Sequence, residues 1–141
     1  MVTFCYANPT PWNTPREKPD EELELMLEEL VSTVKDKSNA IFNFHAPPYG
    51  FGLDLAPELD ENLTQAADRK IHVGSRAVAK MIEKYQPLLG LHGHIHESRG
   101  VQKIRKTTII NPGSEYSEGI LKGVVLILEK GKVKDYIFTN G

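Results

Sequence analysis

Leu88-Leu89-Gly90-Leu91-His92-Gly93-His94-Ile95-His96 is the stretch that decides the fold, because an apolar run leads directly into a pair of histidines. The run from Leu88 to Leu91 predicts a buried strand, and the glycines within and after it predict a turn at its end. Where the backbone stays extended, alternate side chains point to the same side, so His94 and His96 could converge on one metal ion or on two adjacent ions. Neutral imidazole is the commonest transition-metal ligand, so the motif predicts a metal site.

A third histidine, His45, also follows an apolar run, from Asn39 to Phe44, and Pro47 and Pro48 come directly after it. Proline cannot donate a hydrogen bond to a β ladder, so the strand is expected to end there with His45 fixed at its end. Histidines at the ends of two separate strands are how an α/β protein assembles a site from distant segments. A lone His-x-His pair is often an accident of a surface loop, but together with His45 it favours metal ligation.

Three motifs together, Asn43-Phe44-His45, Gly93-His94-Ile95-His96 and Asn111-Pro112-Gly113-Ser114, resemble the second half of a calcineurin-like metallophosphoesterase, most closely the small prokaryotic and archaeal members. The patterns of the family's first half, Asp-x-His, Gly-Asp-x-x-Asp and Gly-Asn-His-Asp/Glu, do not occur in this sequence. The resemblance implies one α/β domain over residues 1–141, the C-terminal half of a four-layer α-β-β-α sandwich, with a mixed sheet and two main helices. By this comparison Met1 falls in the middle of the enzyme, so we expect a C-terminal fragment, a split subunit or a shortened relative.

In the family that the sequence resembles, two divalent ions share a bridging aspartate and a bridging water, which attacks the phosphorus of a phosphoester. The resemblance implies that His45 and His94 serve one ion and His96 the other, with manganese, iron, zinc, nickel or magnesium as the metal, and that the Asn111 turn supports the site. The remaining ligands and the histidine that protonates the leaving group would belong to the first half, so the catalytic residue is unknown. We expect a metal-dependent phosphoesterase that is active only when completed; the alternative is a non-catalytic metal-binding or assembly module.

His72 and Arg16 are the candidate substrate-binding residues. His72 precedes a predicted helix start at Ser75, where anions are favoured, and a similar turn in relatives makes it a candidate phosphate contact. A packed histidine beside a simple helix cap is the alternative. Arg16 and Trp12 stand in a proline-rich loop that is unlikely to fold on itself, where they could grip a phosphate or stack on a base. In the alternative, Trp12 packs on the sheet and Arg16 meets an acidic neighbour, and the preference of large aromatics for the core favours this alternative.

The other elements follow from periodicity. Apolar residues three and four apart predict one helix from Asp20 to Lys37, with Asp20 capping its first turn, and a second from Ser75 to Tyr85. The stretch from Phe51 to Lys70 has no clean period and predicts a long loop or short helical pieces, with Asp54 and Asp60 on a charged rim of the cleft. Further strands are predicted over Val2 to Tyr6, Val101 to Lys106, Thr107 to Ile110, Val124 to Glu129 and Val133 to Thr139, the last two joined by a tight turn at Lys130-Gly131.

Composition narrows the expected partners. With 17 basic and 19 acidic residues the formal net charge is -2, so a membrane is not an expected partner and nucleic acid is expected only as a substrate. The single cysteine, Cys5, fits a reducing cytoplasm, and its apolar neighbours predict a buried thiol. We expect a soluble cytoplasmic protein that binds a phosphoester and pairs with a complementing N-terminal half or with copies of itself.

Overall fold

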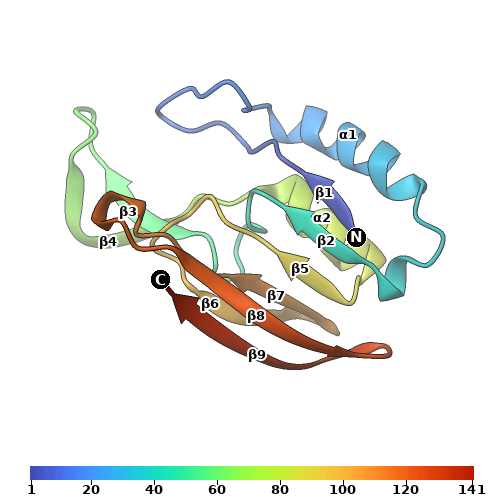
Figure 1. The fold of residues 1–141 in the computed structure, drawn as a ribbon. Coiled ribbons are helices and arrows are strands. Elements are labelled where there is room, and N and C mark those ends of the chain that lie inside the picture. The colour runs from blue at the N-terminus through green and yellow to red at the C-terminus, as the bar shows by residue number, and fades with distance from the viewer.

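The main sheet has five strands in the order β1-β2-β5-β7-β6 (Figure 1). The computed structural model describes the backbone of residues 1–141 and all side chains except those of residues 65–68. Four strands run parallel and β6 pairs antiparallel with β7 at one edge, which confirms the predicted α/β class with a mixed sheet. The strands are β1 (Val2–Phe4), β2 (Ile41–Phe44), β5 (Leu89–Leu91), β6 (Gly100–Ile104) and β7 (Thr107–Asn111).

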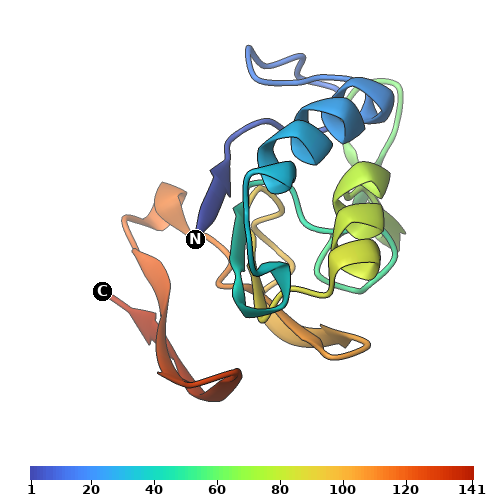
Figure 2. The same ribbon diagram turned by 90° about the vertical axis from the view of Figure 1, so that its right-hand side faces the viewer.

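Two helices, α1 (Asp20–Ser32) and α2 (Arg76–Tyr85), pack against each other and cover one face of this sheet (Figure 2). Their apolar stripes bury Leu23, Leu27 and Val31 of α1 and Val78, Met81 and Ile82 of α2 against Phe42 and Phe44 of the sheet. This arrangement of one helical layer on one sheet is half of an α/β sandwich. Neither helix, nor any other helix among the described residues, is long and apolar enough to cross a membrane.

The first helix differs from its prediction at both ends. It stops at Ser32 rather than Lys37, and a short 3-10 helix, η1 (Lys37–Asn39), leads into β2. Pro19, not Asp20, is its N-cap, and the Asp20 carboxylate instead accepts hydrogen bonds at the start of α2. The donors are the Ser75 hydroxyl at 2.5 Å and the backbone amides of Arg76 and Ala77 at 3.1 Å each. Asp20 therefore joins the two helices, a long-range role that periodicity within one helix does not reveal.

The stretch predicted as a loop or short helical pieces is a hairpin of β3 (Leu55–Leu59) and β4 (Gln65–His72). That prediction was wrong because the hairpin has little apolar alternation and depends on turn chemistry. The Asp60 carboxylate accepts the backbone amides of Asn62 and Thr64, each at 2.8 Å, and so closes the turn. Asp60 is therefore a turn residue.

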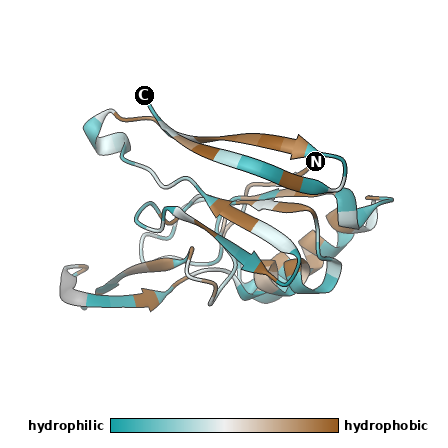
Figure 3. Cartoon of the chain, turned by 90° about the horizontal axis from the view of Figure 1, so that it is seen from below, coloured by the Kyte–Doolittle hydropathy of each residue, from teal (hydrophilic) through white to brown (hydrophobic). Residues whose placement is uncertain are grey.

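A second hairpin, β8 (Lys122–Glu129) and β9 (Lys132–Asn140), follows the short 3-10 helix η2 (Tyr116–Glu118) and confirms the predicted turn at Gly131. It lies on the side of the five-stranded sheet opposite to the helices, as Figures 2 and 3 show from two directions. Arg99 links it to the rest of the chain: its guanidinium lies 4.7 Å from the centre of the Phe138 ring and donates to the Asn140 side chain at 3.1 Å.

Candidate metal centre

The carboxyl ends of the parallel strands meet at one edge of the sheet, where they open a cleft of about 650 Å³. His45 follows β2 and His94 follows β5, so two of the three predicted metal ligands line this cleft together with Arg16. Cys5, just beyond β1, also lines it and is exposed. The prediction of a buried thiol was wrong because side chains alternate along β1: Val2 and Phe4 face the core, and Thr3 and Cys5 face out.

His45 and His94 form a close pair. The Nε2 atom of His45 lies 3.3 Å from the Nδ1 atom of His94, and their rings meet edge to face with centroids 5.0 Å apart. Two nitrogens bound at about 2.0–2.1 Å to one tetrahedral ion would be separated by about 3.3 Å. The pair therefore fits two ligands of one metal ion, although the same spacing also suits a hydrogen bond between the two rings.

The surroundings of the pair favour the neutral form of both imidazoles, which is the form that binds metal. Burial lowers the pKa of His45, and the nearby charges of His96 and Arg16 lower it further. Burial and then His45 lower the pKa of His94, which Glu17 partly offsets.

His94 has a backbone conformation that is uncommon for a residue with a side chain. Its φ is 63°, and the amide of Ile95 donates to the carbonyl of Gly93 at 2.6 Å across it. An i to i+2 hydrogen bond around a positive φ is the pattern of the strained classic γ-turn. Such strain clusters at functional sites, where the surrounding structure holds it in place.

His96 is not brought into this pair. The extended backbone that would aim His94 and His96 the same way does not form, because β5 ends at Leu91 and the chain turns sharply at His94. His96 is exposed, and its ring lies edge-on to the ring of Tyr116, with the centroids 5.3 Å apart. Among the described side chains no three histidine, cysteine, aspartate or glutamate residues converge closely enough to hold a metal ion.

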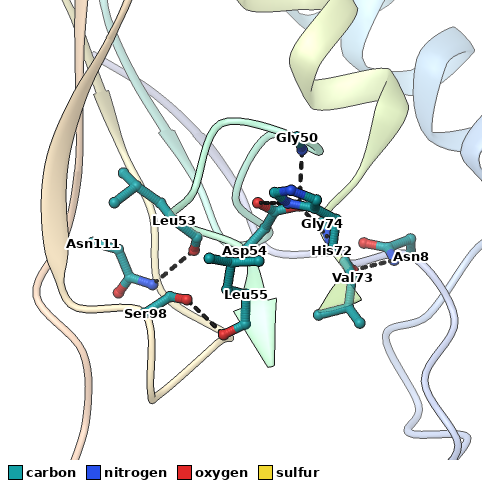
Figure 4. A network of polar contacts seen from close by, with 10 residues as sticks. All are labelled: Asn8, Gly50, Leu53, Asp54, Leu55, His72, Val73, Gly74, Ser98 and Asn111. Carbon is teal, nitrogen blue, oxygen red and sulfur yellow. Dashed lines mark hydrogen bonds and ion pairs between the residues drawn. The ribbon is translucent and has the colours of Figure 1, made fainter. Parts of the chain in front are cut away.

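The Asn111-Pro112-Gly113-Ser114 turn lies against the histidine loop. The side-chain amide of Asn111, fully buried, donates to the carbonyls of Ile95 at 2.8 Å, Gly93 at 3.3 Å and Leu53 at 3.4 Å. Figure 4 shows the contact with Leu53. The backbone amide of Ser114 donates to the carbonyl of His96 at 3.2 Å. Asn111 thus holds the carbonyls on both sides of His94 and fixes the turn that carries it.

His92 has a structural role. It is buried, and its Nδ1 atom lies 2.9 Å from the carbonyl of Phe44 and 3.0 Å from that of Ala46. Burial lowers its pKa to about 4, despite these hydrogen bonds, so the ring is neutral and ties the end of β5 to the end of β2. His92 thereby holds His45 and His94, which follow those two strands, at the same edge.

The proline-rich loop folds back on itself, contrary to expectation, because of Glu17. The carboxylate accepts the Thr10 hydroxyl at 2.5 Å, the Thr10 amide at 2.8 Å and the Thr14 hydroxyl at 2.8 Å. Burial acts to raise the pKa of Glu17, but these hydrogen bonds lower it to about 2. Arg16 beside it is exposed at the cleft and has no ion pair among the described side chains, and Trp12 is 64% exposed rather than packed on the sheet.

His72 lies outside the cleft and contacts Asp54, which was predicted to lie on the charged rim of the cleft. Asp54 is fully buried; its Oδ1 atom is 2.8 Å from Nδ1 of His72, and its Oδ2 atom accepts the amides of Gly50 at 2.9 Å and Gly74 at 3.2 Å (Figure 4). The predicted anion site at the start of α2 is not open, since Asp20 occupies the helix amides there. In the sequence Asp54 follows the glycines at positions 50 and 52, and no motif marks it.

The fold and site define an α/β protein in which parallel strands deliver histidines to one cleft. No family model matches the sequence. It is 37% identical over 108 residues to the uncharacterized protein MJ1162 of Methanocaldococcus jannaschii, a match that covers 75% of this chain and 44% of that protein. The chain therefore spans less than half the length of this relative.

The chain is also similar to parts of two longer solved chains, and the first of these shares its fold. One crystal structure superposes on 97% of this chain and 42% of its own, with a TM-score of 0.52 and 20% identity. The crystal structure of TT1561 of Thermus thermophilus covers 96% of this chain and 47% of its own, with a TM-score of 0.48 and 22% identity.

Proposed function

We propose that this chain is the histidine-bearing part of a metal-dependent phosphoesterase of the calcineurin-like metallophosphoesterase type, which hydrolyses phosphomonoesters or phosphodiesters. The observation that carries the proposal is the His45–His94 pair, whose 3.3 Å nitrogen separation fits one metal ion at the carboxyl edge of a parallel sheet. The strained turn at His94 and its support by Asn111 add to it.

Each residue has a distinct role in this proposal. His45 and His94 hold one divalent ion, and His96, from the same loop, serves a second; the ions are manganese, iron, zinc, nickel or magnesium. Such ions would supply a nucleophile by lowering the pKa of coordinated water and would neutralise charge on the phosphoryl oxygens. Arg16, exposed at the cleft, contacts the phosphoryl group with its guanidinium.

The remaining ligands would come from a complementing segment. Imidazoles alone do not replace a bridging carboxylate, and no third ligand joins the pair among the described side chains. More than half of MJ1162 lies outside the match, which is room for such a segment. We therefore assign the carboxylate ligands and the proton donor to a polypeptide segment that corresponds to that part of MJ1162.

The test compares the chain alone with the chain mixed with the part of MJ1162 that lies outside the match. We expect the chain alone to hold metal weakly and to leave bis(p-nitrophenyl) phosphate intact in manganese, and the mixture to hydrolyse it. His45→Ala and His94→Ala should each reduce the rate at least about a hundredfold, whereas Lys103→Ala, an exposed substitution on β6, should leave it unchanged. Robust hydrolysis by the chain alone would refute the need for completion, and a mixture insensitive to both histidine changes would refute the metal site.

A second candidate function, a non-catalytic assembly module, is favoured by the β8–β9 hairpin. Its outer face exposes Val125, Ile127 and Ile137, with exposed fractions of 53%, 43% and 56%. An apolar patch of this kind is buried most simply against the same patch on a second copy of the chain. Analytical ultracentrifugation should then show a dimer that Ile137→Lys dissociates; a monomer at micromolar concentration would remove this candidate.

A further inference from the structure

Asp54 and His72 form a polar pair that the metal site does not use. The two backbone amides of Gly50 and Gly74 already occupy Oδ2 of Asp54, so the contact of Oδ1 with His72 is not needed to close this turn. A fully buried carboxylate is costly unless it is fully hydrogen-bonded, and here one of its two oxygens is committed to orienting an imidazole whose side chain is 38% exposed.

The orientation of His72 decides which nitrogen faces solvent. A carboxylate only accepts hydrogen bonds, so Nδ1 of the ring donates to it and Nε2 is the nitrogen left for a ligand. Nε2 donates as well when the ring is protonated. The backbone packs closely beside the pair: a Cβ atom on Gly74 would lie 2.6 Å from the carbonyl oxygen of Pro47 and 2.8 Å from Cβ of Asp54. His72 is held at the surface by its contact with the buried Asp54.

The side chain of Arg76 lies over the ring of Tyr49, the same ring that neighbours His72. The ring of Tyr49 lies 5.6 Å from that of His72 between centroids, and the guanidinium of Arg76 lies 3.9 Å from the centre of the same Tyr49 ring. Arg76 is exposed and has no ion pair among the described side chains, so its charge is held in place without being neutralised. Arg69 on the same hairpin as His72 is a contrast, since its side chain pairs with Glu58 at 2.9 Å.

We propose that His72, Tyr49 and Arg76, with Asp54 as the positioning residue, form an oxyanion site for a phosphoryl group that is separate from the histidine cleft. A protonated imidazole, a phenol hydroxyl and a guanidinium are three donors of the kind that bind phosphate oxygens. Tyr49 is only four residues from His45, so the two sites lie within about 13 Å along the chain. If the chain is a phosphoesterase, the group bound here would be a second phosphoryl group of its substrate, and this identification rests on the proposed function. The existence of the oxyanion site does not depend on that function.

The experiment titrates inorganic phosphate into the isotope-labelled chain in the presence of EDTA, at constant pH, and follows the ring signals of His72 and the backbone amide of Gly74 by NMR. We expect a saturable shift of both, weakened about tenfold by Arg76→Ala, and in His72→Gln the shift of the Gly74 amide should be lost. Arg69→Ala removes the same charge from an arginine that is already paired, and it should bind phosphate like the unchanged chain. Because metal is excluded and no hydrolysis is measured, failure here is distinct from failure of the phosphoesterase proposal.

Asp54 has its own readout, the tautomer of His72. In the unchanged chain, ring nitrogen shifts should show the proton on Nδ1. In Asp54→Asn the Oδ1 position would be taken by an amide that donates, so the neutral ring should carry its proton on Nε2. The protonated ring, which needs an acceptor at Nδ1, loses its partner in this variant, so phosphate should bind more weakly. If His72 shows no saturable shift, or if Arg76→Ala and Arg69→Ala bind phosphate equally well, the proposal is overturned.

Discussion

The five-stranded sheet and the β8–β9 hairpin are both rich in apolar residues, but the chain covers them differently. The inner face of the sheet is closed by the two helices, and Phe42, Phe44 and Ile109 are fully buried. The hairpin turns one face toward the sheet and leaves the other open, where Val125 and Ile137 pair across the strands (Figure 3). Strands that are apolar on both faces are typical of a sheet covered on both sides. The comparison teaches that this chain covers the inner face of its sheet with its own helices and leaves the outer face of its hairpin exposed.

The largest expected contrast is in stability. Phe42 is fully buried and stacks on Phe44 with centroids 4.8 Å apart, so Phe42→Ala should lower the free energy of unfolding by about 3–5 kcal/mol. Ile137→Ala removes an exposed side chain and should change it by no more than about 0.5 kcal/mol. Urea unfolding measures both, and an equally large loss for Ile137→Ala would mean that the hairpin face is already covered.

A smaller loss is expected where the helical layer is joined together. Asp20→Ala removes three hydrogen bonds to the start of α2, including the one from the Ser75 hydroxyl, and should cost about 1–3 kcal/mol. Asp135→Ala on the hairpin is the matched control, because among the described residues its carboxylate accepts a hydrogen bond from the backbone amide of Tyr136 alone. Thermal unfolding of the two variants should rank them in this order; equal losses would contradict the joining role of Asp20.

The smallest effect concerns pH. The pKa of Glu17 is lowered from 4.5 to about 2 in the folded chain. Its contribution to the free energy of unfolding is therefore present above pH 4.5 and is lost as the pH falls toward 2. Glu17→Gln should flatten the fall in melting temperature over this range. Glu129 on the hairpin should affect the pH dependence less. Lys134 and Lys132 lower its pKa, but these ion pairs are exposed and screened by salt. A Glu129→Gln variant that flattens the curve as much as Glu17→Gln would contradict this ranking.

Periodicity and strand-end motifs carried much of the sequence prediction. The α/β class, α2 with its Ser75 cap, the hairpin turn at Gly131 and the closeness of His45 and His94 were all foreseen, because each depends on residues close in the chain or on parallel strands ending together. The β3–β4 hairpin, the exposure of Trp12 and the turn that diverts His96 were missed. These depend on turn chemistry and backbone hydrogen bonds, which apolar periodicity does not encode. Asp20 and Asp54 act across more than 15 residues, so their partners became visible only in three dimensions.

The measurement that tests the central claim most directly is a titration of the chain with Co²⁺, a paramagnetic substitute for the proposed metals, followed by NMR of the histidine rings. The account predicts that the ring signals of His45 and His94 shift or broaden first and together, while those of buried His92 respond far less. It also predicts that His45→Ala and His94→Ala each abolish this response. If Co²⁺ affects His96 or His72 before the pair, or if the response survives loss of either histidine, then the pair is not the metal centre.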